Sequence, residues 1–267
     1  MAGTSAPQTL VVRGTAGELV ALEGQALQGV MRRGKFLVFT FERDRIIINP
    51  MLTGRLGLAA PGTKALTSTA FVLRFGPRTQ APPDLAPWTR GARWQPADVS
   101  DVDLRYRDPT RMGKVYLLPA GVPRPVAGWD EQGPDVDDAT LDLDEWCRRI
   151  KRHSGELKNL LKNQSFVAGI GNGYSDEILW AARLAPFRKR STLATEEIDR
   201  LWEAARSVPR WAIDELRLRV PPRFETEVRG FLRVHRKGGD PCPRCGTSIS
   251  EISPGGFVTS WCRTCQV

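Results

Sequence analysis

The C-terminal tail of the chain carries two pairs of cysteines, Cys242-Pro-Arg-Cys245 and Cys262-Arg-Thr-Cys265. Sixteen residues separate the pairs, which is the spacing of a four-cysteine zinc site in which each pair supplies two thiolates. The tail has too little apolar content to fold unaided, so metal binding must supply much of its folding free energy. We therefore predict that residues 236–267 form a zinc ribbon with one structural Zn²⁺.

The alternative use of these cysteines is a pair of disulfides in a secreted chain. The chain opens without the basic, apolar and small-residue pattern of a secretory signal. We therefore expect a cytoplasmic location, where thiols stay reduced and bind metal. The fifth cysteine, Cys147, is expected to be a buried helix thiol.

The charge of the chain suits a polyanionic partner. Lys and Arg total 39 against 30 Asp and Glu, which gives a net charge of +9. Such a balance favours nucleic acid, with salt-dependent binding, and the basic residues gather in short clusters such as 148–152 and 188–190. No apolar run is long enough to span a bilayer, so no membrane partner is expected.

Residues 1–118 have the pattern of an antiparallel β-domain. Two apolar runs flank the polar segment 42–45 and predict a hairpin over 36–48, and further strands are expected at 71–75, 103–106 and 114–118. The first 17 residues are expected to be loose, with one short strand at most. Together these strands predict a β-sandwich or a partly closed barrel.

The pattern becomes helical after a linker rich in proline and glycine, 119–134. Within 135–235 we expect helices near 143–150, 157–161 and 178–184. A fourth is expected to start at Thr195 and to be interrupted at Pro209, with a separate helix over 212–218 that Pro221-Pro222 stops. The fold class is therefore α+β, with a β-sandwich, a helical domain and a zinc ribbon.

Several segments resemble the formamidopyrimidine-DNA glycosylase and endonuclease VIII family. Leu157–Glu177, with its Gly169-Ile-Gly171-Asn172 turn, resembles the helix–two-turns–helix module of that family. The ribbon ending in Cys262-Arg-Thr-Cys265-Gln resembles its finger, and Arg32–Leu37 and Asp108–Gly113 resemble its hairpin and its Asp-Pro-Arg-Arg-Phe-Gly loop. The match runs from about Leu19 to Val267.

The resemblance implies a base-excision DNA repair protein, a bifunctional glycosylase and AP lyase that acts on oxidised bases in double-stranded damaged DNA as a monomer. The glycines let backbone amides approach a phosphate at the start of a helix, whose dipole favours an anion. Asn172, Lys158 and Gly171 are then expected to hold phosphates that flank the lesion. An ordinary helix–helix turn is the alternative.

Other family positions fall on loops of the β-domain. The family loop His-Leu-Gly-Met-Ser-Gly corresponds to Asn49–Gly54, so Leu52 is expected to be the wedge, and Met112 stands where the family has a Phe. Such apolar side chains fit base flipping. Arg111 matches a family arginine, with a sheet-edge arginine as the alternative. Glu177 matches a family glutamate near the damaged nucleotide, with a helix-surface acid as the alternative.

The chain also departs from the family pattern. Family enzymes begin with Pro-Glu after removal of Met, whereas this chain begins Met1-Ala2-Gly3. We expect either a chain truncated at its N-terminus or a protein that does not use the proline amine. Lys35, at the hairpin lysine of the family, is then the expected catalytic residue, with a solvated charge as the alternative. Phe257 stands where the family's finger carries an arginine.

Two other functions remain open. One is a catalytically impaired protein that binds damaged DNA. The other is a zinc-ribbon protein that binds RNA or the ribosome, which the β-domain and its hairpin lysine disfavour.

Overall fold

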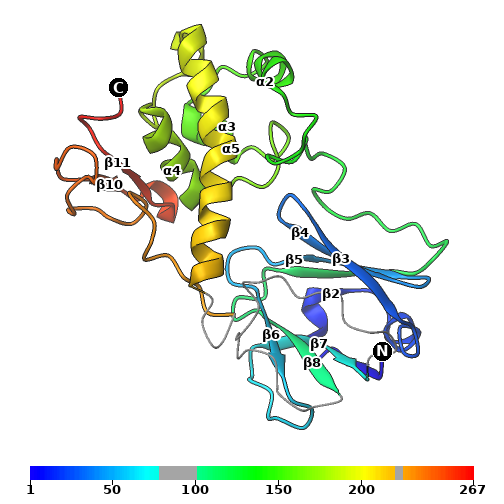
Figure 1. Ribbon diagram of the computed structural model, residues 1–267. Helices are drawn as coiled ribbons and strands as arrows, with labels where there is room; N and C mark the ends of the chain where they lie inside the picture. The colour runs from blue at the N-terminus through cyan, green and yellow to red at the C-terminus, as the bar shows by residue number, and fades with distance from the viewer. Residues whose placement is uncertain (78–100, 220–224) are drawn as a thin grey trace. The chain divides into compact units, whose positions relative to one another are not determined.

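Two sheets, and a separate set of helices with a ribbon, make up the computed structural model, which describes residues 1–77, 101–219 and 225–267 (Figure 1). The chain divides into two units. Unit 1 comprises Met1–Ala127 with Arg217–Glu227, and unit 2 comprises Gly128–Leu216 with Val228–Val267. Pro221-Pro222, expected to stop the last helix, lies outside the described residues.

Unit 1 contains the two larger sheets. The five-stranded sheet has the order β2 (Val12–Arg13), β9 (Lys114–Leu118), β5 (Arg45–Asn49), β4 (Phe36–Phe41), β3 (Leu27–Arg33). The four-stranded sheet has the order β1 (Gly3–Ser5), β7 (Thr69–Phe75), β8 (Val102–Arg107), β6 (Arg55–Ala59). Every named pairing within these sheets is antiparallel except β2 with β9.

The two sheets share one apolar core. Phe39 and Ile46 of the larger sheet and Phe71, Leu73 and Tyr106 of the smaller one belong to the same buried cluster. The predicted hairpin over 36–48 is confirmed by the pairing of β4 with β5, and the expected β-sandwich is present.

The first residues are more ordered than expected. β1 pairs with β7, a 3₁₀ turn spans Thr9–Val11, and α1 covers Ala16–Val20. Thr15 begins α1 with a capping box: its hydroxyl accepts from the Glu18 amide, and the Glu18 carboxylate accepts from the Thr15 amide. The expectation of a loose start was wrong because the partner strand of β1 lies far away in the sequence.

The Asp108 carboxylate joins two loops at one edge of unit 1. It is fully buried and accepts hydrogen bonds from the Thr53 hydroxyl (2.5 Å), the Gly113 amide (2.6 Å) and the Thr110 hydroxyl (3.1 Å). These donors tie the loop after β5 to the loop after β8. Burial alone would raise the pKa of Asp108, but hydrogen bonds from Thr53, Gly113 and Thr110 outweigh it and hold the pKa below its usual value.

Unit 2 packs its helices around a second core. They are α2 (Leu143–Ile150), α3 (Leu157–Lys162), α4 (Asn172–Ala182), the 3₁₀ turn Arg190–Thr192 and α5 (Thr195–Leu218). Trp146, Leu161, Phe166, Leu179 and Leu201 are among the buried residues of the core. Asp142 caps α2 by accepting from the Glu145 amide.

Helix α5 differs from the prediction of two helices. It runs unbroken through Pro209, and its start at Thr195 is as expected. A proline ring fixes φ near a helical value and removes one backbone donor, so it costs stability without forcing an end. The apolar face continues past it, since Val208 and Ala212 are both buried. Cys147, expected to be buried, is half-buried instead.

The ribbon follows the helices. β10 (Ser250–Ile252) pairs antiparallel with β11 (Thr259–Trp261), and the 3₁₀ turn Pro254–Gly256 lies between them. Within 1–77, 101–219 and 225–267, no helix combines the length and apolar character needed to cross a membrane.

Replacing Asp108 with Asn should lower the free energy of unfolding of unit 1 by about 1–3 kcal/mol at pH 7, because an amide nitrogen cannot accept from the donors that remain buried. A depressed pKa gives stability that is present above the unfolded-state value and lost as pH falls through the folded-state value. The difference between wild type and Asp108→Asn in urea unfolding should therefore shrink in acid. Equal stability at pH 7, matching an Asp101→Asn control, would contradict this role.

Candidate nucleic-acid interface

The side chain of Gln164 fixes the backbone of the turn between α3 and α4. Gly169 has φ +101°, a value that favours glycine, and its amide donates to the Gln164 side-chain oxygen at 3.0 Å. The Gln164 amide group donates to the backbone oxygens of Lys162 and Ile170. Gly171 precedes the helix, and no side chain of the described residues caps the start of α4. An uncapped helix start, with its dipole, favours an anion.

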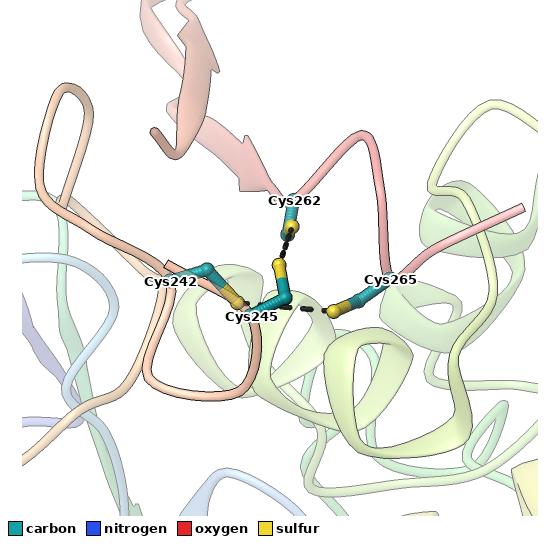
Figure 2. Close-up of side chains that lie close together, drawn as sticks. All are labelled: Cys242, Cys245, Cys262 and Cys265. Carbon is teal, nitrogen blue, oxygen red and sulfur yellow. Dashed lines mark hydrogen bonds between the residues drawn. The ribbon is translucent and has the colours of Figure 1, made fainter. Parts of the chain in front are cut away.

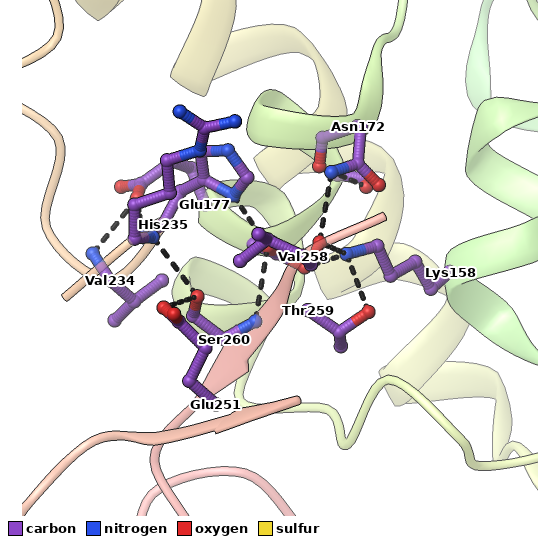
Figure 3. A network of polar contacts seen from close by, with 12 residues as sticks. Lys158, Asn172, Glu177, Val234, His235, Glu251, Val258, Thr259 and Ser260 are labelled. Atoms are coloured by element: carbon purple, nitrogen blue, oxygen red, sulfur yellow. Dashed lines mark hydrogen bonds and ion pairs between the residues drawn. The ribbon is translucent and has the colours of Figure 1, made fainter. Parts of the chain in front are cut away.

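The finger hairpin is fastened to this turn through one carbonyl group. The backbone oxygen of Val258 accepts from Asn172 Nδ2 at 2.8 Å and from Lys158 Nζ at 2.7 Å (Figure 3). Lys158 Nζ also donates to Thr259 Oγ1 at 2.8 Å. Two of the three residues that were expected to hold phosphates, Asn172 and Lys158, therefore bind the finger in this structure.

Lys158 is a buried cation. Its side chain is 5% exposed, and its ammonium lies 2.7 Å from Asp176 Oδ1. Burial lowers the pKa of Lys158, while the Asp176 carboxylate acts against that shift. A charge enclosed in this way supports the turn and does not face solvent.

Asp176 brings together several parts of unit 2 at the first turns of α4. Its Oδ2 atom lies 2.7 Å from His235 Nδ1 and accepts from the Ser260 amide at 3.2 Å. Because a carboxylate only accepts, Nδ1 is the donor in the contact with His235. His235 also packs on Gly173, where an added Cβ would lie 3.1 Å from its ring. The helix, the connector before the ribbon and β11 thus meet at one buried carboxylate.

Glu177 holds the connector itself. Its carboxylate accepts from the amides of Arg233, Val234 and His235 at 2.9–3.1 Å, and the residue is 1% exposed. The expected alternative of a helix-surface acid is therefore wrong. Sequence reasoning missed the network of Asp176, Glu177 and His235. The available signal was a pair of adjacent acids followed directly by Ile178 and Leu179 in a helix that is buried along most of its length.

The four tail cysteines form a compact cluster. Their sulfur atoms all lie within 4.8 Å of one another, with Cys242 and Cys265 at 4.0 Å and Cys245 and Cys262 at 3.5 Å (Figure 2). A tetrahedral zinc with Zn–S bonds of about 2.3 Å requires sulfur separations of about 3.8 Å, so the donor set fits one zinc. The predicted structural zinc site is confirmed.

Hydrogen bonds hold the cysteine cluster against the C-terminal end of α4. Trp180 Nε1 donates to Cys242 Sγ at 3.4 Å. Gln266 accepts from the Cys262 amide and donates to the Leu184 backbone oxygen. Both contacts orient metal ligands against the helix, so α4 carries the ribbon at its start and at its end.

The remaining expected site residues belong to unit 1. Leu52 and Met112 are 60% and 44% exposed, on the two loops that Asp108 joins. Arg111 lies on the second of these loops with φ +57°. Lys35 is exposed in the two-residue turn between β3 and β4. The structure thus brings the two wedge loops together, and it places Lys35 elsewhere in the same unit, in the β3–β4 hairpin.

Comparison with known families gives matches over most of the chain. The formamidopyrimidine-DNA glycosylase N-terminal domain matches residues 4–115, the formamidopyrimidine-DNA glycosylase H2TH domain matches 132–219, and the zinc finger found in FPG and IleRS matches 239–267. A similar protein is the formamidopyrimidine-DNA glycosylase of Thermomicrobium roseum, 34% identical over 246 residues, which cover 88% of this chain and 80% of that protein.

Solved structures give the same result. The MutM (Fpg) protein of Thermus thermophilus has a TM-score of 0.74 and 26% identity, over 99% of this chain and 90% of that one. The Lactococcus lactis Fpg in complex with DNA that contains Fapy-dG has a TM-score of 0.78 and 23% identity, over 99% and 91%. The second likeness concerns the fold alone.

Removing the metal should unfold the ribbon. We expect one zinc per chain by elemental analysis, and we expect Cys262→Ser to lose it, because a serine hydroxyl stays protonated at neutral pH and cannot replace the fourth thiolate ligand. Cys147→Ser should keep the metal and is the matched control. Zinc content of Cys262→Ser equal to wild type would contradict the assignment.

Proposed function

Because the chain belongs to the formamidopyrimidine-DNA glycosylase family, we propose that it is a base-excision repair glycosylase that removes oxidised bases from duplex DNA. The observation that carries the proposal is the uncapped start of α4, fastened to the zinc finger through the Val258 carbonyl group. The proposed ligand of this helix start is a phosphate of the damaged strand, as its dipole and amides favour. The net charge of +9 supports a DNA partner.

The contacts of Asn172 and Lys158 change the roles that the sequence predicted for them. Gly171 has no side chain, so a DNA strand can approach the protein backbone closely at the start of α4. Asn172 and Lys158 act by fixing the finger on the turn, and the buried Oδ1 atom of Asn172, which has no hydrogen-bond partner among the described residues, supports an interaction with a group that the DNA brings. The reducing cytoplasm, where zinc thiolates persist, is the proposed location.

Leu52 and Met112 are the proposed wedges. Both side chains are apolar and exposed. The Asp108 carboxylate already fixes the two loops that carry them, so DNA binding does not have to pay the entropy of ordering these loops. Apolar side chains inserted at a base step lower the cost of extruding the damaged nucleotide. Arg111 lies on the same loop as Met112 and is proposed to bind DNA beside the two wedges.

Lys35 is the proposed amine for the lyase step. The neutral amine adds to the C1′ aldehyde of an abasic site, and loss of water gives a Schiff base. Removal of a C2′ proton then breaks the bond to the 3′ oxygen, so that the 3′ phosphate leaves as an anion. Hydrolysis of the imine returns the amine. Phe257, in place of a finger arginine, offers no proton donor for a second elimination, so nicking by β-elimination alone is proposed.

Asn172→Ala should weaken binding to every duplex by a similar factor, about fivefold, because contacts at the phosphates carry no base information. Affinities for an intact duplex and for duplexes with two different lesions, measured by anisotropy, test this. Asn159→Ala, an exposed asparagine on α3, is the control and should bind as wild type. A loss confined to one lesion would show that Asn172 takes part in base readout.

Lys35→Ala should abolish both nicking of abasic-site DNA and trapping of the imine by borohydride. Lys64→Ala, another lysine of unit 1, should leave both unchanged. Trapping of Lys35→Ala at the wild-type level would show that another amine attacks. Abasic-site DNA that wild type binds but neither nicks nor traps would identify a damaged-DNA-binding protein without catalysis.

A further inference from the structure

The tip of the finger presents an exposed aromatic ring beside a cation. Phe257 is 50% exposed, and the ammonium of Lys162 lies 5.4 Å from the centre of its ring. The ring follows the turn Pro254–Gly256, in which Gly255 and Gly256 both have positive φ, and the Phe257 amide donates to the Pro254 backbone oxygen. The turn is therefore closed by its own hydrogen bond and holds the ring in place.

Three segments converge at this ring. Phe257 directly precedes Val258, whose carbonyl group is bound by Asn172 at the start of α4 and by Lys158 of α3. Lys162 is the last residue of α3, and its backbone oxygen accepts from Gln164, the residue that also holds the Gly169 amide. An aromatic face, an ammonium and an uncapped helix start therefore lie next to one another within unit 2.

The pair combines two kinds of attraction. An ammonium near a ring is drawn to the π-face, which here keeps the cation at the finger tip although the finger has no arginine at that position. Half of the surface of Phe257 stays exposed and is available for stacking. A nucleotide matches both features, since its base or sugar packs on an aromatic ring while its phosphate pairs with a cation. A purely apolar partner would match the ring but offer nothing to the ammonium.

We propose that Phe257 and Lys162 together bind the nucleotide adjacent to the phosphate held at the start of α4, with the ring against the unstacked base or sugar and the ammonium on its phosphate. The inference rests on the proposed binding of damaged duplex DNA. Bases in an intact duplex are already stacked, so the ring gains a partner only beside a gap or lesion. The lysine contributes to both kinds of duplex, because a phosphate is present in each.

The test compares affinities for a duplex with a central tetrahydrofuran abasic analogue and for the matched intact duplex, at several salt concentrations. Phe257→Ala should weaken binding to the abasic duplex about tenfold, the size of one base–aromatic stack, and binding to the intact duplex less than about twofold. Phe257→Tyr should bind as wild type. Ile252→Ala, a change at another exposed apolar residue of the same hairpin, is the matched control, and zinc content monitors folding.

Lys162→Met keeps an apolar stem but removes the charge. It should weaken binding to both duplexes and reduce the slope of log affinity against log salt by about 1. Phe257→Arg should lose the preference for the abasic duplex, since an arginine replaces the ring with charge.

The inference is overturned if Phe257→Ala binds the abasic duplex as wild type does, or if it loses affinity equally for both duplexes. It is also overturned if Lys162→Met leaves the salt slope unchanged. Failure of the proposed function has a different signature, because wild type itself would then bind the abasic duplex no more tightly than the intact one.

Discussion

The Asp176 carboxylate is the interaction on which the organisation of unit 2 depends. A buried carboxylate is unfavourable unless charge and hydrogen bonds compensate it. Here Lys158 comes from α3, His235 from the connector and the Ser260 amide from the ribbon, so all three segments must be in place at once. Glu177, the next residue, fixes the connector through three amides. We infer that the start of α4, the proposed phosphate site, is ordered only when the finger is docked.

In the proposed function, this arrangement gives the zinc an indirect role in DNA binding. The metal holds the ribbon, and the ribbon supplies the Val258 carbonyl group that Asn172 and Lys158 bind. Unit 1 is also organised by a buried carboxylate, because Asp108 joins the loops that carry Leu52 and Met112. In both units the exposed side chains that are assigned to DNA are held by buried polar groups, so the surface is formed before the ligand arrives.

Much of this could be predicted from the sequence, because local spacing determines it. The zinc ligands, the hairpin over 36–48, the Asp142 cap and the start of α5 all depend on residues close in the chain. The buried acids could not be predicted, since every partner of Glu177 named above and all partners of Asp176 except Lys158 lie 56 to 84 residues away, on the connector and the ribbon. For the same reason Lys158 was expected to reach phosphates and is enclosed instead. At Pro209, a continuous buried face outweighed a local helix-breaking signal.

The central claim is that finger docking orders the start of α4. Hydrogen–deuterium exchange, measured on the zinc-loaded protein and on the same protein after chelation, tests it most directly, because exchange reports local opening segment by segment. The account predicts that chelation increases exchange of the ribbon, of residues 172–177 and of the connector 233–235 together, while α2 stays protected. Faster exchange confined to residues 242–267, with the start of α4 unchanged, would contradict it.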